Sequence, residues 1–248
     1  MSKELIPRVL HYIWLGGKPL PKQLQTNVDN WQRLMPDYRL VRWDEGNYDV
    51  GAHPWAAQMH REGRFAFVSD LVRLDVLHQH GGVYLDVDME LYKPLDAFLG
   101  ERLLLSFQFD SFLSTGIIGS CKGNPFLQEW MLRYDQLGGA QVSNDVVTRL
   151  FLERFPKFRL NNRDQRVDNG GIRVLPKEYF ILPTWNKEID YGVDQSFNSW
   201  KQPHGRPYGK YVRAVIGNVL FYKLINMRMN WRSEYLAMDK ARRRAAAK

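Results

Sequence analysis

The chain has 248 residues, 44% of them hydrophobic and 13% aromatic, so it can bury a sizeable core and lacks the composition of a disordered protein. Its one cysteine, Cys121, excludes an internal disulfide, and no run of about eighteen apolar residues predicts a membrane-spanning helix. The net charge of +8 arises at the C-terminal end, because residues 201–248 hold twelve Lys and Arg against two acids, whereas residues 1–200 hold 23 against 25.

Strand and helix patterns alternate along the first part of the chain. They predict strands at residues 8–15, 38–44 and 83–91 and helices at residues 22–34, 54–62 and 67–78. A strand, a helix and a second strand at the start of the chain are typical of a βαβ unit, which favours a parallel or mixed sheet with helices on its faces. We therefore expect an α/β fold with a Rossmann-like mixed sheet.

Further strands and helices are predicted in the second part of the chain. They are strands at residues 101–109, 112–120 and 172–176 and helices at residues 125–137 and 143–155. In the last of these helices Ser143 or Asn144 is the expected N-cap, and Asp145 lies in the first turn, where a carboxylate interacts favourably with the helix dipole. Asp145 is therefore interpreted as a capping acid.

From Tyr211 onward, apolar residues recur at helical spacing and basic residues lie elsewhere around the helix. The apolar residues are Val212, Val215, Ile216, Val219, Leu220, Leu224, Met227 and Trp231. Two interpretations stay open for this basic amphipathic helix: it lies on an anionic membrane surface, or it packs on the domain and leaves a solvated basic tail. We assign residues 1–200 to the main domain and residues 201–248 to a C-terminal helical extension.

Two carboxylates stand close together in the central part of the chain. In the predicted strand Asp86 and Asp88 project from the same face, where their like charges repel. A hard divalent cation removes this conflict, whereas two aspartates at a solvated strand end need no ligand. We favour the cation because a helix with Asp70 and Arg73 one turn apart and a Gly81-Gly82 turn lead directly into the strand.

Trp14 follows the first predicted strand, just before Gly16-Gly17. Ligands of α/β sheets bind outside the carboxyl ends of the strands, so an aromatic side chain at this point is placed to stack on a base or a sugar. The alternative is that Trp14 belongs to the core.

Three blocks of sequence carry a resemblance to a known family. They are Ile6-Pro7-x-x-x-His11-x-x-Trp14-x-Gly16, then Phe67-Val68-Ser69-Asp70-x-x-Arg73 with Gly81-Gly82-x-Tyr84-Leu85-Asp86-x-Asp88, and finally Ser199-Trp200. Together they resemble glycosyltransferase family 32, which contains relatives of yeast initiating mannosyltransferases, bacterial capsular polysaccharide transferases and clostridial glucosylating toxins. The resemblance is dense over residues 6–95 and thin from about residue 100 to residue 190.

The resemblance implies a GT-A fold, a nucleotide-sugar donor, a divalent metal and retention of the anomeric configuration. The residues that it assigns to the donor are Trp14, Gly16, Ser69, Asp70, Arg73, Tyr84, Asp86, Ser199 and Trp200. The residues that it assigns to catalysis are Asp70, Arg73, Asp86 and Asp88. Among them, Trp14 would stack on the base of the donor.

One departure from the family concerns the loop before Ser199. Asp194-Gln195 stand where many bacterial members have His-His. The Asp194 carboxylate can still supply an oxygen to a hard cation, and Asn198 can supply a second one. The expected metal ligands are therefore Asp86, Asp88, Asp194 and Asn198, unless this loop has lost its part in metal binding.

The sequence thus predicts a retaining, metal-dependent glycosyltransferase that moves a hexosyl or N-acetylhexosaminyl group. The expected donor is a UDP-sugar, or else GDP-mannose, with Mn²⁺ or Mg²⁺. The expected acceptor is a hydroxyl of a glycan or a lipid-linked oligosaccharide in surface polysaccharide synthesis. Because the N-terminus has no long apolar segment, we expect a cytoplasmic protein. The first interpretation of its C-terminal helix would hold it at the inner face of the membrane.

Two other functions are compatible with parts of the sequence. LDVDM could be the nucleophilic DxD of a phosphotransferase or phosphatase, but the Lys and the second acidic pair of that chemistry have no convincing positions downstream. A nucleic-acid-binding module would explain the net basic charge, but the aromatic-rich body is near neutral, so no nucleic-acid partner is expected. The linkage, the oligomeric state and any nucleophile stay open.

Overall fold

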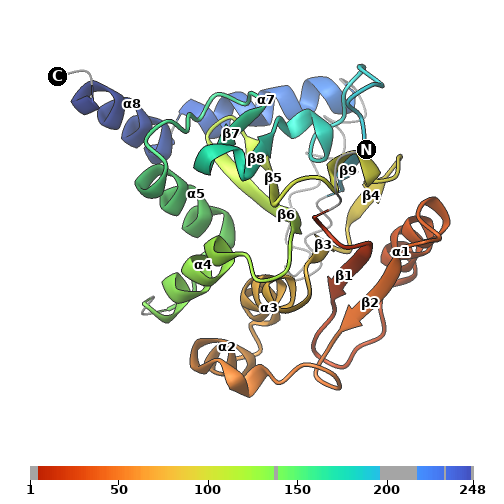
Figure 1. Cartoon of the computed structure of the whole chain (residues 1–248). Coiled ribbons are helices and arrows are strands. Elements are labelled where there is room, and N and C mark those ends of the chain that lie inside the picture. The colour runs from red at the N-terminus through yellow and green to blue at the C-terminus, as the bar shows by residue number, and fades with distance from the viewer. Residues whose placement is uncertain (1–4, 137–138, 196–216, 232, 247–248) are drawn as a thin grey trace.

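The computed structural model describes residues 5–136, 139–195, 217–231 and 233–246, and a mixed β-sheet lies at its centre (Figure 1). The strands of this sheet are β1 (Val9–Ile13), β2 (Arg39–Trp43), β3 (Gly82–Leu85), β5 (Leu103–Phe109), β6 (Phe112–Ser120), β7 (Gln165–Val167) and β8 (Ile172–Leu175). Their order is β2-β1-β3-β6-β5-β8-β7. A separate antiparallel pair joins β4 (Met89–Leu91) to β9 (Gly192–Asp194).

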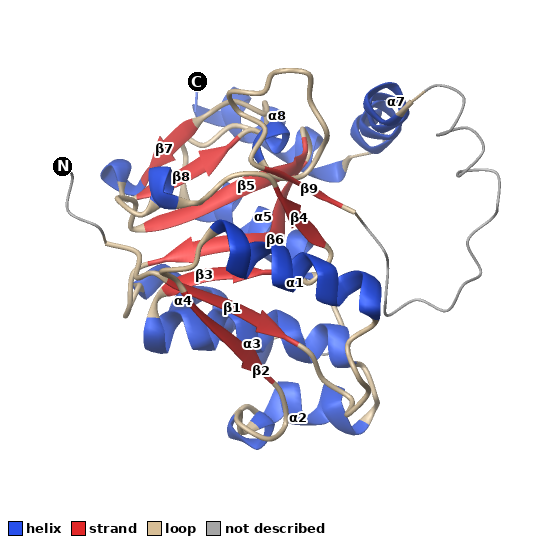
Figure 2. Cartoon of the chain, turned by 90° about the vertical axis from the view of Figure 1, so that its right-hand side faces the viewer, coloured by secondary structure: helices blue, strands red, loops and turns tan. Residues whose placement is uncertain are grey.

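Helices cover both faces of the large sheet (Figure 2). They are α1 (Lys22–Leu34), α2 (Pro54–Arg61), α3 (Phe65–His80), α4 (Pro125–Asp135), α5 (Ser143–Arg154), α7 (Asn218–Trp231) and α8 (Glu234–Ala246). One group of buried apolar side chains packs the helices α2, α3, α4, α5 and α8 against the sheet. A second group packs α1 and α7 against the sheet. Side chains alternate along a strand, so Tyr84 of β3 belongs to the first group and Val83 and Leu85 to the second.

The predicted βαβ unit and mixed sheet are confirmed. β1 pairs in parallel with β2 and also with β3, whereas β6 is antiparallel to both of its neighbours. α1 has the predicted limits, and its buried residues Leu24, Val28 and Trp31 recur at the spacing that keeps one helical face against the sheet. In the part of the chain that the structure describes, no helix is both long and apolar enough to cross a membrane.

The continuous strand predicted at residues 83–91 is wrong. β3 ends at Leu85 and β4 begins at Met89, and the residues between them form a turn in which the Met89 N–H donates to the Asp86 carbonyl oxygen at 3.0 Å. The chain leaves the large sheet here because β4 pairs with β9. Asp86 and Asp88 therefore lie in a turn between two sheets and not on one face of one strand.

The predicted N-cap of α5 is also wrong. The N-cap position is Val142, and neither Ser143 nor Asn144 caps the helix. The Ser143 hydroxyl is buried and accepts a hydrogen bond from the Tyr134 hydroxyl at 2.8 Å. This hydroxyl, which the local sequence predicted as a helix cap, is therefore hydrogen-bonded within the core. Asp145 lies in the first turn, as predicted.

The described residues of the C-terminal region form two helices, α7 and α8, where the sequence predicted one amphipathic helix. Of the predicted apolar residues, Val212, Val215 and Ile216 lie outside the described residues, and the exposed ones on α7 are Leu220, Leu224, Met227 and Trp231. Phe221 and Ile225 instead pack against the core. The predicted division at residue 200 also lies outside the described residues and stays a prediction.

His11 ties β1 to the end of α3. Its Nδ1 accepts a hydrogen bond from the Trp43 indole N–H at 3.0 Å, so its Nε2 carries the proton and donates to the Gly81 carbonyl oxygen at 2.8 Å. Residue 82, which follows Gly81, must be glycine, because a Cβ at this position would lie 2.6 Å from the Val9 carbonyl oxygen and 2.8 Å from Nε2 of His11. Burial lowers the pKa of His11 from 6.5 to about 4.

We expect the protonation of His11 to weaken the fold in acid. An unfolded chain binds a proton at this histidine below about pH 6.5, whereas the folded chain does so only near pH 4. The stabilisation by neutral His11 is therefore complete above pH 6.5 and is lost as the pH falls towards 4, at a cost of about 3 kcal/mol of unfolding free energy.

Urea unfolding at about pH 7 and about pH 4.5 measures this effect. The variant His11→Asn should lack this part of the pH dependence, while His60→Asn, at a partly exposed site, should retain it. Equal pH dependence in the wild type and in His11→Asn would contradict the role of His11.

Candidate active site

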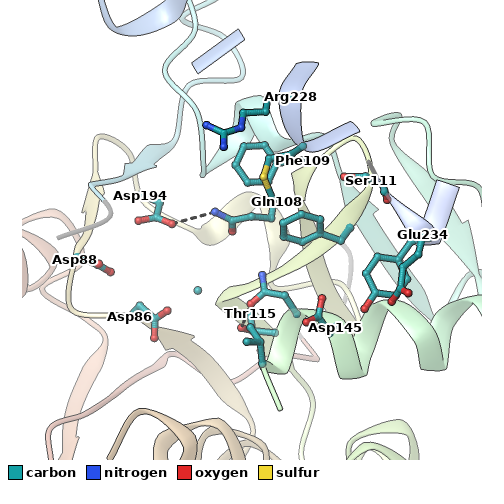
Figure 3. A pocket seen from close by; sticks show the side chains of 17 residues that line it. Asp86, Asp88, Gln108, Phe109, Ser111, Thr115, Asp145, Asp194, Arg228 and Glu234 are labelled. Atoms are coloured by element: carbon teal, nitrogen blue, oxygen red, sulfur yellow. Dashed lines mark hydrogen bonds between the residues drawn. The ribbon is translucent and has the colours of Figure 1, made fainter. Parts of the chain in front are cut away.

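A cavity of about 700 Å³ opens beside the turn between β3 and β4 (Figure 3). Asp86, Asp88 and Asp194 line one end of it. Its other walls come from the β5–β6 hairpin, the start of α5 and the junction of α7 and α8. The fold thus gathers segments that are far apart in the sequence around one cavity.

Backbone and side-chain hydrogen bonds fix Asp86 at the edge of the large sheet. The Asp86 N–H donates to the Gly116 carbonyl oxygen at 2.8 Å, and the Tyr84 hydroxyl donates to Oδ1 of Asp86 at 2.6 Å. A Cβ at Gly116 would lie 3.3 Å from Oδ2 of Asp86. Glycine at this position keeps the space around that second carboxylate oxygen open.

Arg73 is a buried cation behind Asp86. Its guanidinium donates to the Thr115 carbonyl oxygen at 2.7 Å and lies 2.8 Å from Oδ1 of Asp70 and 3.4 Å from Oδ1 of Asp86. It also lies over the Tyr84 ring, at 4.6 Å from the ring centre. These contacts hold the carboxylate of Asp86 in one orientation.

The charges around Arg73 shift each other's pKa. Burial raises the pKa of Asp70 to about 7, while Arg73 and a hydrogen bond from the Ser143 N–H oppose this increase. Burial alone would lower the pKa of Arg73, but Asp86, Tyr84 and Asp70 raise it above its ordinary value. Arg73 is therefore a permanent positive charge next to Asp86.

The pairing of β4 with β9 brings Asp194 to the same cavity. Asp194 stands opposite the first residue of β4, and the Gln195 N–H donates to the Asp88 carbonyl oxygen at 3.0 Å. The Gln108 side chain donates to Oδ2 of Asp194 at 3.3 Å (Figure 3). Three of the four expected metal ligands thus line one cavity.

The donor atoms at this end of the cavity suit a hard cation. Carboxylate oxygens are the ligands that Mg²⁺ and Mn²⁺ prefer, and water and substrate phosphates commonly complete the shell of such an ion. Among the described residues, no three His, Cys, Asp or Glu side chains are grouped closely enough to hold a metal ion. The fourth expected ligand, Asn198, lies outside the described residues, as do Ser199 and Trp200.

The predicted donor residues divide into two places. Ser69, Asp70, Arg73, Tyr84 and Asp86 come together, and the Ser69 hydroxyl accepts a hydrogen bond from Arg73 at 3.3 Å. Of this group only Asp86 is among the residues that line the cavity, and Trp14 and Gly16 belong to neither the group nor the cavity lining. The assignment of both groups to the donor stays a prediction.

Trp14 and Gly16 have structural contacts of their own. The Trp14 indole N–H donates to the Lys18 carbonyl oxygen at 2.7 Å, and its partly buried ring packs against the second core group. A Cβ at Gly16 would lie 2.7 Å from the Phe65 ring, so glycine lets the end of β1 approach the start of α3.

The wall opposite Asp86 was not predicted. It contains Phe109 and Phe112, whose rings meet edge-on with 5.2 Å between their centres, and Arg228 of α7. Asp145, interpreted from the sequence as a capping acid, also lines the cavity. Two phenylalanines around a short turn were a signal for this wall, whereas nothing in the sequence of α7 indicates that it folds back over the hairpin.

Asp110, at the tip of the β5–β6 hairpin, holds α7 in place. Its N–H donates to Asn226 at 3.1 Å, and its carboxylate accepts hydrogen bonds from Asn226 at 2.9 Å, from Asn230 at 3.0 Å and from the buried Lys177. Burial raises the pKa of Asp110, but these hydrogen bonds outweigh it and lower the pKa below its ordinary value. We call these four residues, Asp110, Lys177, Asn226 and Asn230, the Asp110 cluster. Arg228 lies between the two asparagines in the sequence, so the cluster also fixes the part of α7 that lines the cavity.

We expect Asp110→Ala to detach α7 from the hairpin. The substitution leaves Lys177 buried without this carboxylate and should cost about 3 kcal/mol of unfolding free energy. Hydrogen exchange of the α7 amides should become faster. The control Asp37→Ala removes an exposed carboxylate 2.6 Å from Arg8 and should cost less than about 1 kcal/mol. Unchanged exchange in α7 would refute the role of Asp110.

Comparison with known proteins indicates the enzyme class. Residues 21–105 match the model of a family described as "Glycosyltransferase sugar-binding region containing DXD motif". The chain is a glycosyltransferase. The matched region includes the Asp70–Arg73 helix and the Asp86–Asp88 turn, in agreement with the resemblance to family 32. The phosphotransferase and nucleic-acid-binding alternatives are therefore not supported.

Relatives of this glycosyltransferase occur in a virus and in yeasts. It is 27% identical over 177 residues to the uncharacterized glycosyltransferase L373 of Acanthamoeba polyphaga mimivirus, covering 64% of this chain and 68% of that protein. It is 21% identical over 198 residues to the mannosyl phosphorylinositol ceramide synthase SUR1 of Saccharomyces cerevisiae, with 74% and 50% coverage. It is 29% identical over 126 residues to inositol phosphoceramide mannosyltransferase 3 of Schizosaccharomyces pombe, with 49% and 35% coverage. The glycosyltransferase thus spans half or less of these two yeast proteins.

A solved structure shares the fold of this glycosyltransferase. The PaToxG glycosyltransferase superposes with a TM-score of 0.52 at 19% identity, over 61% of this chain and 70% of that chain. At this identity the likeness shows the fold alone, which is the predicted GT-A type.

Proposed function

We propose that this glycosyltransferase moves a sugar from a nucleotide-diphosphate donor to a hydroxyl group, with a divalent cation bound at the Asp86–Asp88 turn. The observation that carries the proposal is that Asp86, Asp88 and Asp194 line one cavity while the buried Arg73 orients Asp86. A UDP-sugar is the favoured donor and GDP-mannose the second choice, and the moved group is a hexose or an N-acetylhexosamine.

Asp86 and Asp88 would hold the cation, with Asp194 as a further ligand and Mn²⁺ as the first choice. Tyr84 and Arg73 both contact Oδ1 of Asp86, so Oδ2, next to Gly116, is the oxygen available to a ligand. When bound, the cation neutralises the negative charge that develops on the leaving diphosphate.

Retention of configuration is the proposed stereochemical outcome. A carboxylate nucleophile beneath the anomeric carbon would give retention in two steps, and we assign no residue to that role. In the working mechanism the acceptor hydroxyl attacks from the front face. The bond between the anomeric carbon and the diphosphate breaks, the new glycosidic bond forms, and the hydroxyl proton passes to the leaving phosphate.

The proposed acceptor is a hydroxyl of a glycan or of a lipid-linked oligosaccharide. The names of the two yeast relatives refer to inositol phosphoceramide, a lipid with a sugar-like headgroup. This supports an acceptor carried by a lipid, in surface polysaccharide synthesis. A cytoplasmic protein at the inner face of the membrane would meet such an acceptor.

A thermal-shift panel of UDP- and GDP-sugars tests the donor. A ligand that binds only the native state raises the melting temperature, so one donor should raise it with Mn²⁺ and lose this effect with chelator. The same donor should then release its nucleotide slowly by hydrolysis in the presence of Mn²⁺. A folded protein that no donor stabilises, and that hydrolyses none of them, would refute the proposal.

A further inference from the structure

α7 carries a row of apolar side chains that face solvent, which we call the α7 stripe. Its members and their exposed fractions are Leu220 (48%), Leu224 (50%), Met227 (67%) and Trp231 (91%). Steps of four, three and four residues keep them on one line along the helix. Because Phe221 and Ile225 pack against the core, α7 is apolar on two faces, of which the core covers one.

Basic side chains flank the α7 stripe on both sides. At 100° per residue, Lys223 and Arg228 fall on opposite sides of it, and both are exposed. The sequence from residue 195 to residue 233 contains seven Lys and Arg and no Asp or Glu. The charges of Lys223 and Arg228 are complementary to an anionic surface, and Lys and Arg near such a bilayer each contribute about 1 kcal/mol of attraction.

Tryptophans add the side chain that is typical of a membrane–water interface. Trp231 is the most exposed member of the α7 stripe, and Trp185, at 76% exposed, lies beside the helix, with its ring centre 5.4 Å from the Lys223 ammonium. An apolar row edged by cations and aromatic rings is the composition of a helix that lies in the plane of a bilayer surface.

The Asp110 cluster fixes the α7 stripe relative to the cavity. Asn226 and Asn230 bind Asp110 on another side of the same helix, and Arg228 and Met229 line the cavity. Figure 3 shows Arg228 above Phe109 at the cavity wall. A surface that contacts the α7 stripe therefore lies next to the cavity.

We propose that the α7 stripe docks the protein on an anionic membrane. Its apolar side chains enter the headgroup region, Lys223 pairs with lipid phosphates or carboxylates, and the cavity is held beside the bilayer. The purpose of this contact rests on the proposed function, since a hydroxyl on a lipid headgroup would reach the cavity from there. Docking itself needs neither donor nor metal.

Flotation of the full chain with vesicles tests the proposal. The protein should float with phosphatidylcholine vesicles that contain about one-third phosphatidylserine, and much less with pure phosphatidylcholine. Leu224→Gln should weaken this binding about tenfold. The matched control is Leu132→Gln on α4, which removes a leucine of similar exposure, 54%, and should bind as the wild type does. Lys223→Gln should weaken binding to the anionic vesicles about fivefold.

Several outcomes would overturn the proposal. The first is no flotation with anionic vesicles, and the second is an equal loss for Leu224→Gln and Leu132→Gln. A third is a dimer in lipid-free solution that Leu224→Gln converts to a monomer, because the α7 stripe would then join two copies. A fourth is a melting temperature that Leu224→Gln alone lowers in a protein that binds no vesicles, because the chain itself would then cover the stripe. Donor-induced stabilisation measured without vesicles reports on the proposed function separately.

Discussion

Replacing Arg73 by methionine should lower the unfolding free energy by about 3–5 kcal/mol and lower sugar transfer by about a hundredfold or more. The substitution leaves Asp70 buried without its cation and the Thr115 carbonyl oxygen without its donor. It also removes the charge that orients Asp86 from behind. Urea unfolding and donor turnover measure the two effects separately.

A second variant separates the structural from the functional part of this effect. Asp70→Asn combined with Arg73→Met removes both buried charges, so it should recover a substantial part of the lost stability. Transfer should stay low, because Asp86 still lacks its orienting cation. Full stability of Arg73→Met, or full transfer by the double variant, would contradict the assigned role.

Asp88→Asn should lower transfer by about 10²–10³-fold and change the unfolding free energy by less than about 1 kcal/mol. Asparagine keeps the size of the side chain, and the hydrogen bond from Gln195 at 3.0 Å goes to the backbone carbonyl of residue 88, which the substitution retains. The carboxylate charge for the cation is lost, so the variant should need more Mn²⁺ for half-maximal turnover. The measurement is turnover as a function of Mn²⁺ concentration.

Two comparisons sharpen this test. Asp96→Asn removes the charge of an exposed carboxylate that lies 2.5 Å from Arg8 and should leave turnover unchanged. Asp194→Asn should raise the required Mn²⁺ concentration if Asp194 is a ligand, and should leave it unchanged if this loop has lost its part in metal binding. Turnover that resists both Asp88→Asn and chelator would exclude the metal role.

Local sequence patterns were sufficient for most of the elements. The helix at residues 22–34 and the strand at residues 112–120 have the predicted limits, because prolines, glycines and a tight turn mark their ends. Patterns of this kind depend on neighbouring residues alone. The fold class followed from them, since the first strand, helix and strand form a βαβ unit.

The errors arose where a distant partner competes with the local pattern. Residues 83–91 alternate like one strand, but β4 pairs with β9, which lies about a hundred residues further along the chain. Ser143 has the preference of an N-cap, but the Tyr134 hydroxyl binds it in the core. Neither β9 nor Tyr134 can be identified as the partner from the residues that surround β4 or Ser143 in the sequence.

The candidate site likewise contains a part that the sequence predicted and a part that it did not. Asp70, Arg73 and Asp86 were predicted as a group because they belong to one compact motif, and they do come together. The wall with Phe109 and Arg228 depends on the Asp110 cluster, which joins a hairpin to a helix more than a hundred residues later. Spacing within a motif cannot reveal such a contact.

A one-residue deletion inside β9 should lower sugar transfer far more than a one-residue deletion in the loop before β9. Side chains alternate along a strand, so a slip of one residue against β4 would turn Asp194 away from the cavity and put Val193 or Gln195 in its place. The loop can change in length while β9 keeps its register. The side chains that line this end of the cavity are thus determined by strand pairing as well as by residue type.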